Sequence, residues 1–555
     1  MKVRYRGGPR RPVAGLVAIV AVMAVLAAGC GSSSSSSSGT TEPELANGTN
    51  ITVPNPGEPQ AGGTLKFGLN AETDGWSPIK NQWAGSAYIV AGAIFDHLTE
   101  YDTNGVAQPY LAESLTANAT FTEWTIKMRP NVTFHDGEKC DAAALKKNFE
   151  AQRASVLIGP VFANVASIDI VDDLTVKLNM SQPWSTFPDQ MTTQPGAVAA
   201  PAMIDAPDGG VRKPIGTGPF SFVDWTPDNK LDVKKYDSYW RTGYPLLDGI
   251  EFQVLPDLSS RSAALTSGAV DVIEQGDAQQ IKLLTEDARN GQLQIYTDAG
   301  LQQNETFIAL NLAKAPFDDP LARQIVAYGT NRDLLSTSVY QGLFKPALGP
   351  FGEAEPFFVK TDMPTYDPVR AQKLSDEYTQ KYGHPLRFNL SVTPQPEVMQ
   401  IAQAGQQTYK DVGVEMTIVP VDQAKLITDT ILGNYEATGF ILFGTNTLDV
   451  NYVFLHSQTV KPVGQLSLNF TRNDDPILSK ALDDARKTDN RDEQIAQYKI
   501  VQEQMAKDLN FIFLVHNLES VAYSNSTHGL TDQTLPDGQP KQISVVPTLY
   551  GAWKS

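Results

Sequence analysis

Cysteine is almost absent from this 555-residue chain, which has only Cys30 and Cys140. A zinc site built from cysteines needs about four thiols, so a site of this kind is excluded. Histidine is also scarce, with six residues, and no two of them are close enough in sequence to suggest a shared metal ion. We therefore expect a fold stabilised by side-chain packing, with no metal site and no cofactor.

The sequence motifs of common catalytic sites are also missing. The chain has no G-x-S-x-G, no H-E-x-x-H, no G-x-x-x-x-G-K-[ST], and no G-x-G-x-x-G after a strand pattern. His135-Asp136-Gly137 could suggest an acid–base pair, but Asp-Gly favours a turn. Cys140 is expected to be a small buried side chain rather than a nucleophile, and Gly216-Thr217-Gly218-Pro219 is expected to form a tight turn. The motifs therefore give no indication of an enzyme.

One long apolar run, Val13 to Ala28, follows a basic N-terminus. Its 16 residues are fewer than the roughly 20 that a membrane-spanning helix needs. Basic residues, an apolar core and small residues occur here in the order of a secretory signal, which predicts a signal peptide over residues 1–29. Leu26-Ala27-Ala28-Gly29-Cys30 resembles a bacterial lipobox. This resemblance implies cleavage before Cys30, a diacylglycerol on its sulfur, and a palmitate-type lipid anchor in the cell membrane.

The segment after Cys30 has the composition of a tether. Ser32 to Ser38 are seven consecutive serines, and Pro, Asn, Gly and Thr remain frequent to about residue 60. Such a segment buries too little apolar surface to offset its conformational entropy. Residues 30–60 are therefore predicted to be a flexible tether, and folded structure is expected only from about Ala61.

Charge and length limit the possible functions of the mature chain. Removal of residues 1–29 leaves 39 basic residues against 62 acidic ones, a net charge of −23. This balance argues against nucleic-acid binding. About 495 folded residues exceed the roughly 250–300 over which one hydrophobic core keeps growing, so at least two lobes are expected.

Strand and helix patterns are interleaved along the whole length, which indicates a mixed α/β fold. Alternating apolar residues predict strands at 64–69, 124–128, 176–180, 250–254 and 414–418. Asp319-Pro320 and Asp475-Pro476 each combine an N-cap residue with a first-turn proline, and so predict helix starts. Spaced apolar residues predict another amphipathic helix over 495–509. There is no fixed-period repeat.

Several motifs from Gly62 onward resemble those of the extracytoplasmic solute-binding proteins of ABC importers, family 5, which includes oligopeptide-, dipeptide- and nickel-binding proteins. The matching segments are Gly62-Gly63-Thr64-Leu65, Phe95-Asp96-His97-Leu98-Thr99-Glu100-Tyr101-Asp102, Pro109-Tyr110-Leu111-Ala112-Glu113-Ser114, Met128 to Glu138, Pro214 to Phe220, Tyr239-Trp240, Arg261 to Asp271, Ala309-Leu310-Asn311, Pro316 to Gln324 and Tyr366-Asp367-Pro368. Among these, the stretch MRPNVTFHDGE at 128–138 is very specific to the family. The resemblance covers essentially all of residues 61–555.

The resemblance implies a two-lobed, periplasmic-binding-protein-like fold of class II, in the large cluster with an extra subdomain. Lobe I would comprise residues 61–298 and 515–555, with the subdomain inserted at about 73–184, and lobe II would comprise 299–514. A solute would bind between the lobes, and the closed protein would deliver it to a membrane permease and its ATPase subunits. The protein would act outside the cytoplasm, on the periplasmic side of the membrane.

The resemblance also points to candidate ligand contacts. In the first lobe the loop Glu72 to Pro78 would reach the cleft, which selects Trp76 and Ser77; Tyr340 is a weaker candidate, together with Trp83, Tyr88 and Trp225. In the second lobe the run Phe443 to Tyr452 corresponds to a family stretch whose aspartate holds the amino group of a peptide, which selects Phe443, Gly444, Asn446 and Asp449. Asn446 stands in the place of that aspartate. A neutral amide cannot compensate a buried ammonium charge, so ordinary free-amine peptides fit less well unless Asp449 replaces the charge.

The predicted cargo is a peptide or a peptide-like solute. A metal chelate, an oligosaccharide, an opine-like compound or another small molecule remains an alternative, although the two loops that match the family's cleft contain no histidine for nickel. From other classes, a surface enzyme that uses paired acidic residues, or a sensor or chaperone on the same fold, also remains open.

Overall fold

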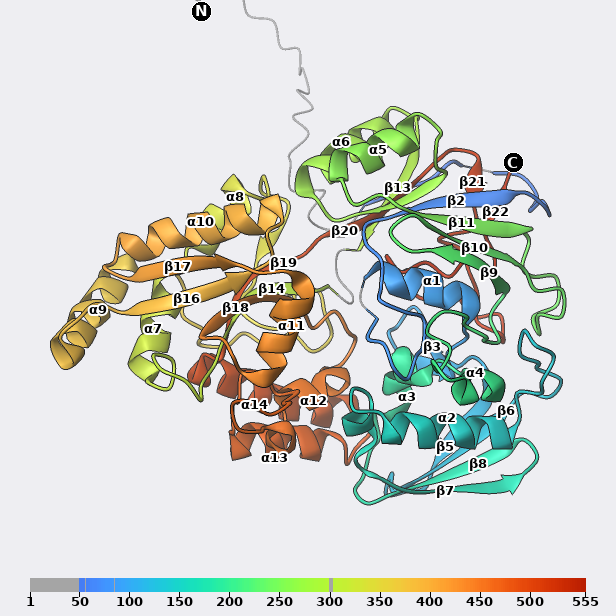
Figure 1. Ribbon diagram of the computed structural model, residues 1–555, viewed down its shortest axis with the longest axis horizontal. Coiled ribbons are helices and arrows are strands. Elements are labelled where there is room, and N and C mark those ends of the chain that lie inside the picture. Colours follow the sequence, from blue (N-terminus) through green and yellow to red (C-terminus); the bar gives the residue numbers. More distant parts are fainter. Residues whose placement is uncertain (1–48, 55, 84, 299–302) are drawn as a thin grey trace, which may run out of the picture. The chain divides into compact units, whose positions relative to one another are not determined.

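Two large β-sheets organise the fold: the first is built mainly before residue 300 and also takes in β20 (Glu519–Tyr523), and the second lies after residue 300 (Figure 1). The computed structural model describes residues 49–54, 56–83, 85–298 and 303–555, all within the unit Pro43–Ser555. The proposed signal peptide and Cys30 therefore lie outside the described residues. Among the residues that are described, no helix combines the length and apolar character needed to cross a bilayer.

The first sheet has eight strands, and most of them precede residue 300. Their order is β1 (Asn50–Ile51), β13 (Gln294–Asp298), β20 (Glu519–Tyr523), β12 (Val272–Gln275), β2 (Thr64–Leu69), β11 (Gly249–Val254), β10 (Lys230–Lys235) and β9 (Phe220–Thr226). β2 is parallel to β11 and β12, whereas the other pairs are antiparallel. The strands predicted at 64–69 and 250–254 are confirmed, and Leu65, Phe67 and Leu69 are buried as their alternation required.

The first sheet begins earlier than the sequence indicated. Asn50 and Ile51 pair with Tyr296 and Ile295 as an edge strand, and the Thr49 N–H donates to Thr297 Oγ1 at 2.7 Å. Composition alone placed this stretch in a tether. It joins the sheet through backbone hydrogen bonds to β13. Polar residues can form such bonds as well as apolar ones, because the bonds use only the backbone.

A segment between β2 and β9 forms separate small sheets. Its antiparallel four-stranded sheet has the order β5 (Ala112–Ala117), β6 (Glu123–Met128), β8 (Thr175–Met180) and β7 (Val165–Asp172). Helix α2 (Ala142–Ala154) packs on β7 and β8, and β3 (Thr99–Tyr101) pairs with β4 (Ala107–Pro109). The strands predicted at 124–128 and 176–180 are confirmed.

The second sheet lies between residues 305 and 516. Its order is β15 (Lys345–Pro346), β19 (Phe511–His516), β14 (Glu305–Leu310), β18 (Ala437–Leu442), β16 (Arg387–Val392) and β17 (Glu415–Pro420). The strand predicted at 414–418 is β17. The chain passes from the first sheet to the second between β13 and β14, and returns between β19 and β20.

The predicted helix starts are confirmed by their caps. The side chain of Asp319 accepts from the Leu321 N–H at 2.9 Å at the start of α7 (Pro320–Gly329). Asp475 accepts from the Ile477 N–H at 2.7 Å ahead of α13 (Pro476–Ala485), and the last predicted helix is α14 (Arg491–Asp508). The family motif Tyr366-Asp367-Pro368 opens α9 (Pro368–Tyr382).

The other helices and strands complete the described chain. They are α1 (Ser86–Ile94), η2 (Gly159–Phe162), α3 (Phe187–Gln190), η3 (Gln194–Gly196), α4 (Pro201–Asp205), α5 (Leu258–Thr266), α6 (Ala278–Arg289), α8 (Arg332–Ser338), α10 (Pro396–Lys410), α11 (Gln423–Leu432), η4 (Leu448–Asn451), α12 (Tyr452–Leu455), η5 (Ser457–Thr459), β21 (Thr527–His528) and β22 (Trp553–Lys554).

The turn after His135 and the thiol of Cys140 have structural roles. The Gly137 N–H donates to the Phe134 carbonyl at 2.9 Å, and Gly137 has a φ of +90°, which closes the predicted turn after His135. Cys140 is buried and unpaired, and burial raises the pKa of its thiol, so it is a poor nucleophile.

Candidate ligand-binding cavity

A cavity of about 1410 Å³ is lined by residues from both sheets and from the chain's C-terminal segment. From the side of the first sheet it is reached by the loop after β2, by α1, and by the ends of β12 and β20. From the side of the second sheet it is reached by β14, β18, α8 and α10. Small-molecule sites usually measure roughly 300–1,000 Å³, so this cavity can hold a ligand of several connected groups.

Three of the predicted contact residues line this cavity, namely Tyr340, Phe443 and Gly444. Tyr340 stacks on Phe344 with ring centroids 4.3 Å apart, so the ring is held in place. Phe443 follows β18 with a φ of +82°, and its ring packs 5.6 Å from that of Phe307. The weaker candidates Trp83 and Tyr88 also line the cavity.

The first-lobe loop reaches the cavity through different residues from those selected. Glu72, Thr73 and Asp74 line it, whereas Trp76 and Ser77 do not. Trp76 is only 1% exposed, and its ring meets the Trp225 ring edge-on with the centroids 5.6 Å apart. The Trp76 ring is therefore part of the core. The Ser77 hydroxyl is buried and accepts from backbone N–H groups of the following turn. The loop is irregular, so the alternation of residues in the sequence does not tell which side chains face the cavity and which face the core.

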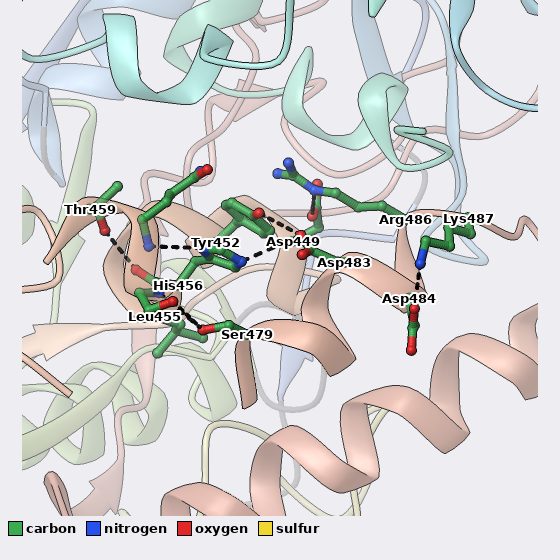
Figure 2. A network of polar contacts seen from close by, with 12 residues as sticks. Asp449, Tyr452, Leu455, His456, Thr459, Ser479, Asp483, Asp484, Arg486 and Lys487 are labelled. Atoms are coloured by element: carbon green, nitrogen blue, oxygen red, sulfur yellow. Dashed lines mark hydrogen bonds and ion pairs between the residues drawn. The ribbon is translucent and has the colours of Figure 1, made fainter. Parts of the chain in front are cut away.

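Asp449 also lies away from the cavity walls, and its charge is already compensated. Its carboxylate is 2.5 Å from Arg486 Nε and accepts from Trp184 Nε1 at 2.8 Å. The Arg486 guanidinium lies over the rings of Trp184 and Tyr452, 3.5 Å from the centroid of the latter. Figure 2 shows this pair beside the Tyr452 ring. Asp449 therefore cannot supply the charge that Asn446 lacks.

The same network fixes the segment that carries the second-lobe loop. Tyr452 donates to Asp483 at 2.7 Å, and His456 lies stacked on Tyr452 with its Nε2 3.4 Å from the same carboxylate (Figure 2). Burial acts to raise the pKa of Asp483, but its contacts with His456 and Tyr452 outweigh burial and hold that pKa below its usual value. These residues join α12 to α13 and have a structural role.

Asn446 is buried beside the cavity and faces the C-terminal segment. Its Nδ2 donates to Gln542 Oε1 at 2.9 Å, and only 5% of the residue is exposed. Gln542 and Thr445 line the cavity, and Asn446 itself does not.

Carboxylates in the cavity wall are the functional groups that sequence reasoning missed. Burial raises the pKa of Glu519 to about 6, with help from Glu274, and raises that of Glu397 to about 7, with help from Asp277. No sequence signal singles them out among 62 acidic residues. They can accept hydrogen bonds from a polar or cationic ligand.

The family assignment comes from comparison with known proteins. The model of bacterial extracellular solute-binding proteins, family 5 (middle), matches residues 106–461, more than half of the chain. The chain belongs to this family. The predicted membership is thereby confirmed, and the family 5 protein described here is a solute-binding component of an ABC transporter. Such proteins act outside the cytoplasm and work with membrane permeases.

Individual relatives agree with this assignment. The family 5 protein is 28% identical over 498 residues to the glutathione-binding protein GsiB of Pectobacterium atrosepticum, covering 83% of this chain and 93% of the relative. Its fold matches that of the periplasmic binding protein DppA from Helicobacter pylori in complex with the peptide STSA (TM-score 0.77, 21% identity, 89% and 98% coverage). It equally matches AgaA from A. tumefaciens R10 in complex with agropinic acid (TM-score 0.77, 23% identity, 89% and 99% coverage). The predicted two-lobed α/β fold class is confirmed.

Proposed function

We propose that this family 5 protein captures a peptide or peptide-like solute outside the cytoplasm and delivers it to an ABC permease without chemical change. The observation that carries the proposal is the cavity of about 1410 Å³, lined from both sheets by aromatic rings, amides and carboxylates. Apolar and aromatic walls with a few polar groups suit a ligand that combines side chains with amide groups. The relatives named glutathione-binding support a short peptide-like cargo.

We further propose the lobe boundaries predicted above, with lobe I at 61–298 and 515–555, its inserted subdomain at about 73–184, and lobe II at 299–514. The crossing between β13 and β14 lies at the first of these boundaries. The second crossing lies between β19, which ends at His516, and β20, which begins at Glu519, so it falls two residues beyond the boundary at 514. Edge strand β1 extends lobe I to residue 50. Solute binding would favour a closed state in which both lobes contact the ligand.

Thermal unfolding of the Gly31–Ser555 protein, stripped of ligand by unfolding and refolding, tests the cargo. At about 100 times its dissociation constant, a ligand stabilises the folded state by roughly 2.7 kcal/mol. A pool of di- to pentapeptides should therefore raise the unfolding temperature, whereas a matched pool of free amino acids should not. An unchanged temperature with peptides would contradict a peptide cargo and favour a non-peptide solute such as an opine-like compound, for which the likeness to AgaA is the supporting observation.

We also propose that Cys30 carries the lipid anchor and that residues 1–29 are removed as a signal peptide. The basic, apolar and small-residue order of the N-terminus supports this. Partitioning into detergent should be strong for the wild type and weak for Cys30→Ala, because two acyl chains give stable membrane attachment. Equal partitioning of the two proteins would contradict the anchor.

A further inference from the structure

One carboxylate in the cavity wall has no counter-charge. Glu397 belongs to the first turn of α10, lines the cavity and is half-buried, so a solute can reach it. In the described part of the chain it forms no ion pair and accepts no hydrogen bond. By contrast, both oxygens of Glu72 in the same wall are engaged, one by Trp225 Nε1 at 2.6 Å and the other by the Asp228 N–H at 2.7 Å. The Glu397 carboxylate is therefore available to a ligand.

A second carboxylate approaches Glu397 from the side of the first sheet. Asp277 lines the cavity just before α6 and is also half-buried. Its Oδ1 caps α6 by accepting from the Gln280 N–H at 2.8 Å, whereas its Oδ2 has no partner among the residues that the structure describes. Burial raises the pKa of Glu397 to about 7, and the charge of Asp277 nearby adds to this effect. A positive group beside both carboxylates would remove the repulsion between them.

An apolar cluster holds the starts of α6 and α10 in place. Ala278, which follows Asp277, packs in one cluster with Tyr340, and Ile401 packs against the same cluster. Ile401 comes one turn after Glu397, on the same face of α10. The packing of apolar side chains therefore brings the two carboxylates to the same part of the cavity.

The face of α10 that carries Glu397 is apolar beyond its first turn. Ile401, Ala404 and Gly405 also line the cavity and are half-buried. They follow Glu397 by four, seven and eight residues, which is the spacing of one helix face. A carboxylate at the end of an apolar strip matches a ligand group with an apolar stem and a cationic tip. The side chains of lysine and arginine have this form.

The lysine and arginine side chains that line the cavity are placed elsewhere. Lys541 is paired with Glu100 at 3.0 Å. Arg261 is fully buried, and its N–H groups donate to backbone and amide oxygens, with its charge acting on Asp277 only as a neighbour. Lys80 is exposed on the loop after β2. None of these three described side chains forms an ion pair with either of the two carboxylates, so a cationic solute would not have to displace one.

We propose that Glu397, Asp277 and Ile401 form a basic-side-chain subsite, which selects solutes with a cationic side chain by binding its stem along α10 and its charge beside the two carboxylates. The proposal rests on the proposed peptide cargo and narrows it to basic peptides or peptide-like solutes. α6 belongs to the proposed lobe I and α10 to the proposed lobe II. A cation that contacts both carboxylates therefore favours the closed state of the lobes.

The test compares two probe pools on the refolded Gly31–Ser555 protein. One pool contains tri- to pentapeptides with one lysine each, and the other contains the same peptides with norleucine in its place, which keeps the carbon stem and lacks the ammonium group. Titration calorimetry should give the wild type about tenfold higher affinity for the lysine pool, because the contact is charge-assisted. In Glu397→Gln this ratio should fall severalfold, since glutamine keeps the shape of the side chain and removes its charge.

A second variant and a charge-matched control accompany Glu397→Gln. Asp277→Asn should also lower the ratio while α6 stays capped, because asparagine caps a helix as well as aspartate does. The control is Glu415→Gln on β17, which removes the same charge from a carboxylate that pairs with Arg387 at the surface and lies outside the cavity wall. This control should leave the ratio of the two affinities unchanged.

Different results would overturn the subsite and the peptide cargo. Equal binding of the two pools by the wild type would overturn the basic-side-chain subsite and leave a peptide cargo standing. A lysine preference of unchanged size in Glu397→Gln would also overturn the subsite, and so would an equal loss for both pools, since a purely structural side chain affects all ligands alike. Binding of neither pool by the native-like protein would overturn both the subsite and the peptide cargo.

Discussion

Asp449 and Arg486 form a buried ion pair that joins the second-lobe loop to the end of α13. Their atoms Oδ1 and Nε are 2.5 Å apart, and the two side chains are 1% and 4% exposed. The ring N–H of Trp184, from the segment between β8 and α3, donates to the other carboxylate oxygen at 2.8 Å. One carboxylate therefore connects parts of the chain that are 265 residues apart. Asp449 stabilises the fold and does not supply a charge for a ligand.

The substitution Asp449→Asn should destabilise the protein by about 3–5 kcal/mol, because it keeps the shape of the side chain but leaves the Arg486 guanidinium buried without its counter-charge. Urea unfolding at pH 7 measures the loss. The matched control is Glu415→Gln, which breaks the pair with Arg387 at the surface, where both side chains are more than half exposed. The control should cost less than about 1 kcal/mol. Equal effects of the two substitutions would contradict the structural role of Asp449.

The glycines of the Gly-Thr-Gly motif are explained by close packing on a helix end. A Cβ on Gly218 would lie 2.5 Å from the carbonyl carbon of Ile94. The Gly218 N–H donates to the carbonyl oxygen of Ile94 at 2.9 Å. Backbone cannot move away as a flexible side chain can. Gly218→Ala should therefore cost about 1–3 kcal/mol or more.

Gly92, inside α1, is the matched control for this substitution. A Cβ there would have no heavy atom within 4 Å, and alanine favours a helix interior by roughly 0.5–1 kcal/mol over glycine. Gly92→Ala should raise the thermal unfolding temperature while Gly218→Ala lowers it. A rise with both substitutions would contradict the packing explanation.

The sequence predicted local structure well because local rules act over a few residues. Alternation sufficed for β2, and an Asp-Pro pair sufficed for α7 and α13. The sequence predicted the ligand contacts less completely, because the direction of a loop side chain depends on tertiary packing. Trp76 turned into the core against Trp225, and no local pattern contained that information.

The partners of the buried charged and amide side chains could not be predicted from the sequence either. Asp449 lies 37 residues from Arg486 and 265 from Trp184, and Asn446 meets Gln542 at a separation of 96 residues. The family motifs identified the fold class and the loop, since these are shared across the family. The individual contacts join residues far apart in the sequence, so they required the three-dimensional structure.

Acid should remove the stabilisation that comes from Glu100. Burial acts to raise its pKa, but Lys541 and His97 outweigh burial and lower that pKa to about 2. A carboxyl whose pKa is lower in the folded than in the unfolded state stabilises the fold above the ordinary value near 4.5, and loses this contribution as the pH falls toward 2. Glu100→Gln should thus cost about 3 kcal/mol at pH 6 and little at pH 2, measured by urea unfolding.

The half-exposed pair of Glu113 and Lys127 provides the control for Glu100. Its atoms are 2.8 Å apart, and the side chains are 41% and 49% exposed. Glu113→Gln should cost less than about 1 kcal/mol at pH 6. A cost for Glu100→Gln that stays constant between pH 6 and pH 2 would show that its carboxylate charge is not what stabilises the fold.

The contact between Glu305 and His516, at the start of β14 and the end of β19, should respond to pH in the opposite way. Glu305 is fully buried, and burial, together with Glu355, raises its pKa well above the ordinary value. Burial, together with Lys345, lowers the pKa of His516 to about 4. The surroundings of the two groups thus favour the uncharged form of each, and Glu305 Oε1 and His516 Nδ1 lie in hydrogen-bond contact at 2.9 Å.

A carboxyl whose pKa is raised by folding contributes stability at low pH and loses it as the pH rises above the unfolded value toward the folded one. Glu305→Gln removes this loss and keeps a hydrogen-bonding group beside His516. The variant should be more stable than the wild type at pH 7.5, and the advantage should shrink toward pH 4. Urea unfolding at both pH values measures it, with the exposed Glu286→Gln as the control. A variant less stable than the wild type at pH 7.5 would mean that Glu305 is ionised and paired with a protonated His516.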